Sequence, residues 1–518
     1  MGLRNTIEDT VASRYLQNCD IPVAENHLEP FVMVVFGGTG DLSKRKLLPA
    51  LFHLFEEREL PNEFAIVGAG RASHSDEEYR NLIRKALREF REPPAAETEI
   101  EEFLRHLFYW SEGPEAVAKF QDLRAKIEAV GAPARDVRKQ VIFYLAVPPG
   151  ATPGIVSRLK EADLSGSRFQ ARIILEKPFG QDLRSARALN ELLREAFTED
   201  RIYRIDHYLG KETVQNLIFL RFSNSIFEHL WNRRYIDNIQ ITVAEELGIE
   251  NRGAFYEQAG VVRDIVQNHI LQIIGLIAME PPIGFSPDFI RDEKVKVFRA
   301  IQPVDEKYAD LFMVRGQYAS GIINGRSVPA YREEKGVDPN SFAPTFFAGK
   351  FYIANWRWAG VPFYVRTGKR MTRRATEVVI QFYQPPLRLF GRSCDTLDPN
   401  ALVITIQPEE KISLRFGVKY PYSANQIYPI DMNFCYRDVF QTPPYPAYER
   451  LLIDCLRGDL TLFVRQDQIE AMWEVVDPIV KRWEETPPLD FPNYAGGTWG
   501  PLEAHRLLER EDRRWITI

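Results

Sequence analysis

The alternation of short apolar runs with amphipathic segments, which begins at Phe31, restricts the fold of this chain more than any other feature. The runs that predict strands are FVMVVF, FAIVG, VIFYLAV, RIILE and IYRI. The segments between them, such as KLLPALFHLF, EEYRNLIRKALREF and SARALNELLREAF, have the spacing of amphipathic helices. Strands that alternate with helices predict a parallel sheet covered by helices. We therefore expect an α/β domain over residues 28–206, after an N-terminal segment 1–27.

The pattern changes after residue 206, because apolar runs then follow one another with few helices between them. The expected strands are residues 235–246, 312–318, 350–358, 363–369, 377–383, 401–407 and 412–419. Expected helices flank these runs at 255–279, 448–458 and 467–485. Such an order is typical of a large, mostly antiparallel sheet. The sequence therefore predicts an α/β plus α+β chain whose second domain, residues 207–518, is a larger β+α domain.

Composition limits the possible partners and compartments. A chain of 518 residues with 66 basic and 72 acidic side chains has a net charge of −6, so no overall basic field favours nucleic acid. The four cysteines, at positions 19, 394, 435 and 455, show no CxxC spacing, which favours a reducing cytoplasm over a disulfide framework. No apolar run reaches the roughly 18 residues of a spanning helix. We expect a cytoplasmic protein with no membrane or nucleic-acid partner.

A glycine-rich turn joins the first strand to the first helix. The sequence FGGTGDLS places Gly37, Gly38, Thr39, Gly40, Asp41 and Leu42 at this point. Glycines allow a pyrophosphate to approach the backbone N–H groups at a helix N-terminus, so the turn predicts a Rossmann-like dinucleotide site. The third glycine of the common GxGxxG pattern falls on Ser43, and a plain tight turn is the alternative.

The end of the second strand indicates which dinucleotide is bound. NAD-selective sites place an acid there, whereas FAIVGAGRAS ends in Arg71 and has no acid before Asp76. A guanidinium suits a 2′-phosphate, which favours NADP. The alternative is that Arg71 is merely solvated.

Three further motifs carry candidate chemistry. EKPFG places Lys177 at a strand end, RIDHYLGKETVQN packs Asp206, His207, Tyr208 and Lys211 around one glycine, and RDIVQNHILQ puts His269 on a helix. The carboxyl edge of an open α/β sheet is where ligands bind. A surface lysine, a solvated helix face and a satisfied core histidine are the structural alternatives to these sites.

Taken together, GGTGDLSKRKLLPALF, EKPFG, RIDHYLGKETVQN, RDIVQNH and VPFYVRTGKR, in this order, resemble the glucose-6-phosphate dehydrogenase family from about residue 31 to about residue 505. The resemblance implies a nucleotide-binding α/β domain joined to a β+α domain. It implies oxidation of glucose 6-phosphate at C1 to the lactone, with hydride transfer to NADP and no metal. By similarity, His269 is the base and Asp206 the acid that orients it.

The resemblance also implies the binding residues. The phosphate contacts would be His207, Tyr208 and Lys211, and Lys177 would lie between sugar and nicotinamide. Weaker local motifs match substrate contacts at Glu245, Asp264, Lys369, Arg374 and Gln407. A second, structural NADP site of animal members is expected to be absent, since the matching places hold Ala375, Thr405 and Trp499.

Two rival functions remain open at this stage. The first is an NADP-dependent dehydrogenase of another hexose phosphate, and the second is a non-catalytic NADP or sugar-phosphate sensor. A sensor is expected to lose the base or the phosphate contacts, whereas this chain keeps both. An exposed sheet face in the second domain would suit a homodimer or homotetramer.

Overall fold

The computed structural model describes residues 28–516 apart from a few short segments. The segments left out are 92–93, 113–115, 131–138, 167, 305–308, 388–398, 423–425 and 442–445. The predicted N-terminal segment 1–27 lies outside the described residues.

A six-stranded parallel sheet organises the first half of the chain, as the alternating pattern predicts. Its strands are β1 (Phe31–Phe36), β2 (Phe64–Gly70), β3 (Leu107–Ser111), β4 (Gln140–Leu145), β5 (Gln170–Leu175) and β6 (Ile202–Arg204). Their order is β3-β2-β1-β4-β5-β6, so the chain leaves β1 first to one side and then to the other. The strand ends at this reversal form the place where open α/β sheets bind ligands.

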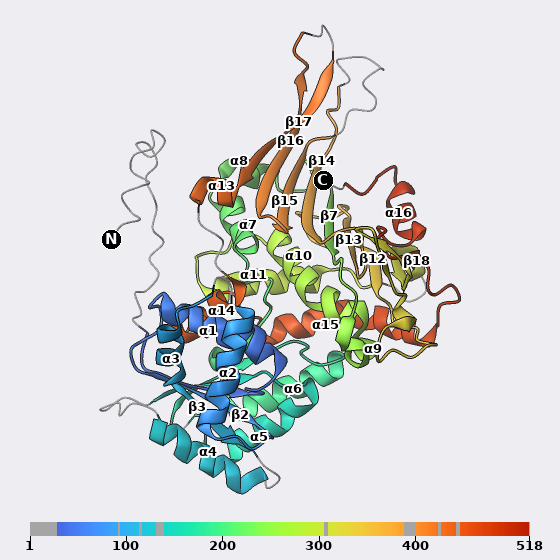
Figure 1. Ribbon diagram of the computed structural model, residues 1–518. Coiled ribbons are helices and arrows are strands. Elements are labelled where there is room, and N and C mark those ends of the chain that lie inside the picture. The colour runs from blue at the N-terminus through green and yellow to red at the C-terminus, as the bar shows by residue number, and fades with distance from the viewer. Residues whose placement is uncertain are drawn as a thin grey trace.

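Helices cover this sheet, as the lower half of Figure 1 shows. They are α1 (Leu48–Glu56), α2 (Asp76–Phe90), α3 (Glu97–Leu104), α4 (Ala116–Val130), α5 (Thr152–Glu161) and α6 (Leu183–Ala196). A reciprocal capping box starts α2, in which the Ser75 hydroxyl accepts the Glu78 N–H and the Glu78 carboxylate accepts the Ser75 N–H. The Rossmann-like α/β prediction is confirmed.

An eight-stranded sheet organises the second half, at the top of Figure 1. Its strands are β7 (Ile236–Ala244), β8 (Met313–Gly316), β12 (Phe346–Phe351), β13 (Phe363–Gly368), β14 (Ala375–Phe382), β15 (Ala401–Gln407), β16 (Lys411–Lys419) and β17 (Ile427–Cys435). Neighbours run antiparallel except β7 and β13. Two small pairs accompany it: β9 (Tyr318–Ala319) with β18 (Tyr494–Ala495), and β10 (Gly321–Ile323) with β11 (Arg326–Val328). The prediction of a mostly antiparallel sheet is therefore confirmed.

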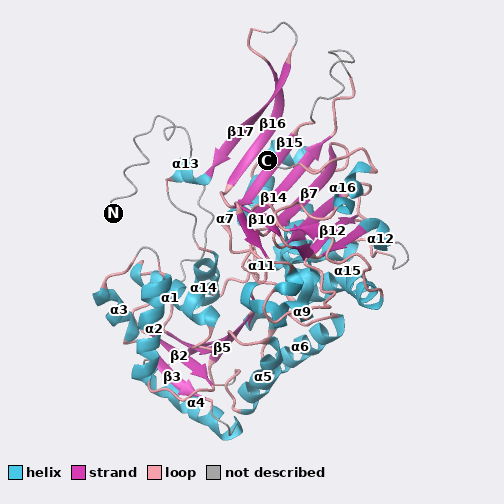
Figure 2. Cartoon of the chain, turned by 45° about the vertical axis from the view of Figure 1, so that its right-hand side comes forward, coloured by secondary structure: helices cyan, strands magenta, loops and turns pink. Residues whose placement is uncertain are grey.

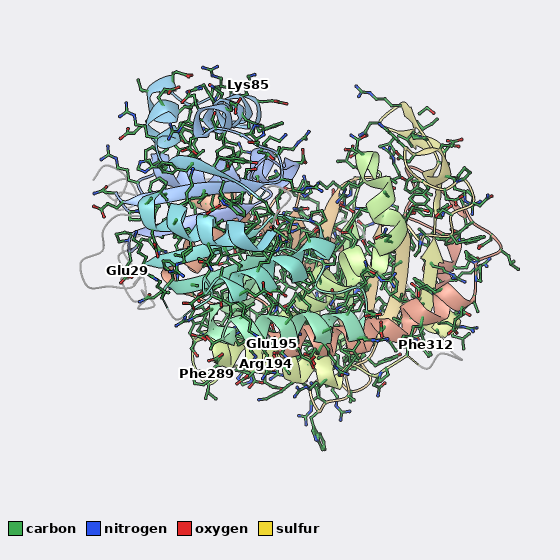
Figure 3. The ribbon with its side chains drawn as sticks, turned by 90° about the horizontal axis from the view of Figure 1, so that it is seen from below. Glu29, Lys85, Arg194, Glu195, Phe289 and Phe312 are labelled. Carbon is green, nitrogen blue, oxygen red and sulfur yellow. The ribbon has the colours of Figure 1, made fainter. Side chains whose placement is uncertain are left out.

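The helices of the second half lie between the two sheets and around the larger one (Figure 2). They are α7 (Glu212–Phe222), α8 (Ser225–Leu230), α9 (Gly253–Val261), α10 (Leu271–Ala278), α11 (Pro287–Ala300), α12 (Ala309–Phe312), α13 (Tyr436–Phe440), α14 (Ala447–Arg457), α15 (Gln466–Glu485) and α16 (Leu502–Glu509). The two halves meet where α6, which carries the labelled Arg194 and Glu195 in Figure 3, packs along α15. They meet again where α1 packs against α14.

The structure differs from the sequence prediction in several strands, among them β3, which the sequence did not predict. The run 350–358 was expected to be extended, but β12 ends at Phe351 and NWRW forms a turn that leaves Trp356 exposed. Asn355 fixes this turn, because its side chain accepts the N–H of Trp358. Strand β17 was not predicted, since its sequence IYPIDMNFC includes a proline and an acid.

The predicted helix 255–279 also departs from regular α geometry. Residues Val262–Ile270 form a π-helix between α9 and α10. The stretch Glu250–Ala278 is long and apolar enough to cross a membrane, but 94% of its apolar window is buried inside the protein. Its burial identifies this stretch as a core helix of a globular fold.

Candidate active site

The glycine turn after β1 packs closely against the backbone of neighbouring segments. Gly37 adopts φ +81°, and a Cβ there would lie 2.2 Å from the Ala146 carbonyl oxygen. A Cβ on Gly38 would lie 2.7 Å from the Gly68 Cα. Both positions therefore require glycine, and the helix that follows begins with N–H groups that have no partner within it. Such a turn fits the pyrophosphate of a dinucleotide.

Arg71 follows the last residue of β2 and is exposed. Among the residues that the structure describes, no hydrogen bond or ion pair holds its guanidinium. Its place at the carboxyl edge of the parallel sheet is where the adenosine half of a dinucleotide is expected. Its predicted role in NADP selectivity stays a prediction.

The π-helix Val262–Ile270 brings Asp264 and His269 to one side of their helix. In an α-helix of 3.6 residues per turn, two residues five apart point about 140° away from each other. An i→i+5 ladder instead places them nearly one above the other. Both side chains accordingly reach the same partner, the ammonium of Lys177 at the end of β5.

His269 is held in one tautomer by its neighbours. Lys177 Nζ lies 2.8 Å from His269 Nε2, and because an ammonium only donates, Nε2 must accept. Nδ1 therefore carries the proton, which it donates to Asp206 Oδ1 at 2.5 Å. Lys177 also donates to the Asp264 carbonyl oxygen at 2.8 Å. The arrangement leaves a basic electron pair on Nε2, the chemistry of a general base.

The charges around the pair agree with this assignment. Burial lowers the pKa of His269, Asp206 raises it, Lys177 lowers it again, and the result lies below the ordinary value. Burial raises the pKa of Asp206, but the hydrogen bond from His269 and the nearby ammonium of Lys177 outweigh it and hold that pKa below its usual range. The resting pair is thus a neutral imidazole beside an ionised carboxylate.

The segment after β6 places three predicted phosphate contacts next to the base. The Tyr208 ring stacks on His269 with centroids 4.2 Å apart, and the His207 ring meets His269 edge-on at 4.6 Å. Lys211 Nζ lies 4.2 Å from the centre of the Tyr208 ring. It is buried without a hydrogen-bond partner among the described residues, and burial lowers the pKa of Lys211 to about 8. A buried ammonium without an acceptor suits an incoming anion.

The remaining predicted contacts form two groups beside this centre. Lys369, which is 1% exposed, pairs with Glu245 and lies 3.5 Å from Asp264 Oδ2. Arg374 donates from Nε to Gln407 Oε1 at 3.3 Å. Arg374 is also near enough to lower the pKa of Lys211, after the larger effect of burial. The structure brings these residues together with the base, whereas their individual roles stay predictions.

Asp206, His207 and His269 also lie close enough to one another to resemble a metal site, with one ligand atom of each within 4.8 Å. Asp206 Oδ1 and His269 Nδ1 are already hydrogen-bonded to each other, and His269 Nε2 faces the ammonium of Lys177. A metal ion here would displace these contacts and stand next to a positive charge. The geometry favours a base held by an acid.

Two carboxylates beside the site were missed by sequence reasoning. Glu176 precedes Lys177 and accepts hydrogen bonds from two tyrosines. Glu410 accepts the Thr213 N–H at 2.9 Å and so caps helix α7 directly after the phosphate contacts. The position of Glu176 within EKPFG was a usable signal, but no sequence pattern connects residue 410 with residue 213.

Models of known protein families match both halves of the chain. The family model described as "Glucose-6-phosphate dehydrogenase, NAD binding domain" matches residues 34–216, and the one described as "Glucose-6-phosphate dehydrogenase, C-terminal domain" matches residues 218–516. The domain boundary expected at Asp206 stays a prediction.

Individual relatives are similar to this chain along nearly its whole length. Glucose-6-phosphate 1-dehydrogenase of Bacillus subtilis is 44% identical over 94% of this chain and 98% of its own. The protein of the same name from Rhizobium meliloti is also 44% identical, with the same coverage.

Solved structures also match this chain along nearly its whole length. One of them, a glucose-6-phosphate dehydrogenase in complex with its substrate glucose-6-phosphate, superposes with a TM-score of 0.85 at 36% identity and covers 94% of this chain and 99% of that one. Glucose-6-phosphate 1-dehydrogenase from Mycobacterium avium superposes with a TM-score of 0.79 at 34% identity, with the same coverage. The chain belongs to the glucose-6-phosphate dehydrogenase family.

Proposed function

We propose that this protein oxidises D-glucose 6-phosphate at C1 to 6-phospho-D-glucono-1,5-lactone with NADP as the hydride acceptor, the first step of the oxidative pentose phosphate pathway. The observation that carries the proposal is the His269 imidazole, whose Nε2 acts as an acceptor, near the buried ammonium of Lys211, which has no hydrogen-bond partner among the described residues. One group accepts a hydroxyl proton and the other binds a phosphate. Membership of the family supports the same reaction.

His269 acts as the base that removes the C1 hydroxyl proton. Its Nε2 is now covered by Lys177, so the sugar hydroxyl takes the position of that ammonium when it donates to Nε2. The Asp206 carboxylate fixes the ring through Nδ1 and stabilises the imidazolium that forms. Lys177, displaced from Nε2, keeps its contacts to Asp264 and holds a positive charge beside the reacting carbon.

The phosphate lies against His207, Tyr208 and Lys211. Burial lowers the pKa of His207 well below its ordinary value, and the nearby charge of Lys177 lowers it further, so His207 binds as a neutral donor. Lys211 supplies the charge. Glu245, Asp264, Lys369, Arg374 and Gln407 bind the remaining hydroxyl and phosphate oxygens.

NADP fits the turn and strand end of the first sheet. When bound there, NADP would supply the acceptor for the hydride that leaves C1 of the sugar. Gly37, Gly38 and Gly40 admit the pyrophosphate to the backbone, and Thr39, Asp41 and Leu42 present the first N–H groups of the helix. Arg71 binds the 2′-phosphate, and Lys177 stands where the sugar and the nicotinamide meet.

The protein works in the cytoplasm as a homodimer or homotetramer. The support is strand β17 at the edge of the large sheet, on which Tyr428, Ile430 and Met432 are exposed. Residues two apart lie on one face of a strand, so these three form one apolar surface. Such a surface suits a second copy of the chain.

The test of the activity is the absorbance at 340 nm after protein, NADP and sugar are mixed. We expect kcat/KM to be highest for glucose 6-phosphate when it is compared with galactose 6-phosphate and glucose. A higher value for galactose 6-phosphate would favour a dehydrogenase of another hexose phosphate. No NADPH with any of the three would overturn the enzymatic proposal.

A further inference from the structure

A carboxylate at the end of β5 connects the two halves of the molecule. Glu176 Oε1 accepts the hydroxyl of Tyr144, from β4, at 2.5 Å. The same oxygen accepts the hydroxyl of Tyr448, from α14, at 3.2 Å. Tyr144 belongs to the parallel sheet, and Tyr448 comes from the far end of the chain. Glu176 therefore anchors α14 of the second half to the first sheet.

Tyr448 in turn lies against the predicted phosphate contacts. Its ring is nearly parallel to that of His207, with centroids 6.4 Å apart and 9° between the planes. The rings of His269 and Tyr208 also lie next to His207, at centroid distances of 4.6 Å and 5.1 Å. His207 thus has three neighbouring rings, and Tyr448 is the one supplied by α14.

The protonation states of His207, Glu176 and Tyr448 make the orientation of the His207 ring important. Burial and nearby positive groups keep the pKa of His207 low, so its imidazole is neutral and binds a phosphate only through a correctly directed N–H. Burial raises the pKa of Glu176, while its hydrogen bonds from Tyr144 and Tyr448 oppose that shift. Burial, followed by the charge of Glu176, raises the pKa of Tyr448 far above the working range, so its hydroxyl stays a donor.

We propose that Tyr448, anchored by Glu176, is a positioning residue that sets the orientation of His207 toward the substrate phosphate. This inference rests on the proposed function, and it assigns a task to two residues outside the predicted contact set. Neither residue has to touch the substrate. Their effect is to keep the His207 ring from turning away from the phosphate.

The test compares phosphate selectivity in matched variants. The measured quantity is the ratio of kcat/KM for glucose 6-phosphate to kcat/KM for glucose, because any change at the base cancels in this ratio. Tyr448→Phe removes the anchoring hydroxyl, and Glu176→Ala removes its acceptor. We expect each to lower the ratio about twofold to tenfold, the effect of one hydrogen bond of about 0.5–1.5 kcal/mol. The double variant should lose no more than either single one.

Two controls separate positioning from general loosening of the domains. Glu176→Gln keeps an acceptor oxygen for both tyrosines and should stay close to the wild-type ratio. Glu449→Gln changes the neighbouring residue on α14, whose carboxylate meets His53 of α1 at 2.7 Å. It weakens another contact between the same halves without touching the His207 rings, so the ratio should not change.

The outcomes distinguish this inference from the proposed function. An active wild type with an unchanged ratio in Tyr448→Phe and Glu176→Ala would overturn the inference alone. Equal losses with both sugars, or additive losses in the double variant, would show a structural role and overturn it as well. An inactive wild type would overturn the proposed function itself.

Discussion

At the residue scale, the proposed reaction depends on His269 keeping its electron pair on Nε2. Asp206 holds the Nδ1 proton, and Lys177 covers Nε2 until a hydroxyl displaces it. Both side chains are only 1% exposed, so water has little access to these contacts. We therefore expect His269 and Asp206 to act as one unit.

His269→Asn should keep the fold and lower kcat by about 10²–10⁴, the range for a removed general base. Asp206→Asn should cost less, and the double variant should lose little more than His269→Asn, because residues of one unit are not additive. Steady-state kinetics with glucose 6-phosphate measure all three. An unchanged kcat in His269→Asn would contradict the assignment of His269 as the base. Losses of kcat in the double variant that equal the product of the two single losses would contradict a unit of His269 and Asp206.

Lys211→Ala should raise KM for glucose 6-phosphate through the loss of a charged hydrogen bond worth about 1.5–3 kcal/mol. KM for NADP and kcat/KM for glucose should change little. The wild type should also lose kcat/KM for the phosphate sugar as pH rises through about 8, because burial lowers the pKa of Lys211 to about 8 and the lysine is charged only below it. The variant should lack this decline. A similar loss with glucose would mark Lys211 as structural.

Arg71→Gln tests the choice of cofactor. The guanidinium can bind a 2′-phosphate through two hydrogen bonds, whereas NAD offers only a hydroxyl at that place. We expect kcat/KM for NADP to fall about tenfold to a hundredfold, from a contact of about 1.5–3 kcal/mol, mainly through KM, while NAD is nearly unaffected. Equal losses with both cofactors would assign Arg71 to the pyrophosphate or to the fold.

At the element scale, the helix that carries the base is shaped by a glycine kink and by its π segment. Gly260 ends the first part of the helix with φ +58° and ψ 178°, a conformation that only glycine adopts readily. Val262–Ile270 then bring Asp264 and His269 to the same side. The two features set the direction from which the base meets Lys177.

Gly260→Ala should lower the melting temperature, since its backbone strain costs about 1–3 kcal/mol. The kcat should fall as well, because the residues that follow lead directly to Asp264. Gly154→Ala is the matched control: Gly154 lies in α5, and the nearest atom to an added Cβ is an Arg158 nitrogen at 3.4 Å. It should leave kcat unchanged and should not lower the melting temperature, because Gly154 lies in the first turn of α5 and alanine has a higher helix propensity than glycine. If Gly260→Ala and Gly154→Ala had the same melting temperature and the same kcat, the role of the kink would be contradicted.

At the scale of the whole molecule, the site lies where the two halves meet. The base and the acid come from different segments, and α14 and α15 of the second half pack against α1 and α6 of the first. The large sheet extends away from this contact, and β16 and β17 extend at the top of Figure 1. The sheet edge is therefore available to a second copy without blocking the site.

Met432→Lys should lower the mass measured by sedimentation velocity, because it places a charge within the apolar face of β17. Leu489→Lys is the control, since Leu489 is equally apolar and fully exposed but lies after α15, outside the sheet. It should leave the mass unchanged. A Met432→Lys protein that keeps the wild-type mass would place the interface elsewhere.

The sequence by itself determined the two sheets, the glycine turn and the motifs of the site. Each of these depends on local information: a period of two or of 3.6 residues, a turn that needs positive φ, or a cluster such as RIDHYLGK within one segment. The predictions that were wrong or incomplete are also local in origin. The apolar run 350–358 gave no sign that Asn355 would turn the chain, and the proline and acid of β17 concealed an edge strand.

Only the tertiary structure decided how these segments meet. The π geometry that turns Asp264 toward the side of His269 has no periodic signal in RDIVQNH. The contacts of Tyr448 with Glu176 and His207 join residues distant in the chain, and they exist because α14 packs on the first domain. Such neighbours follow from the packing of both domains together, which no local pattern encodes.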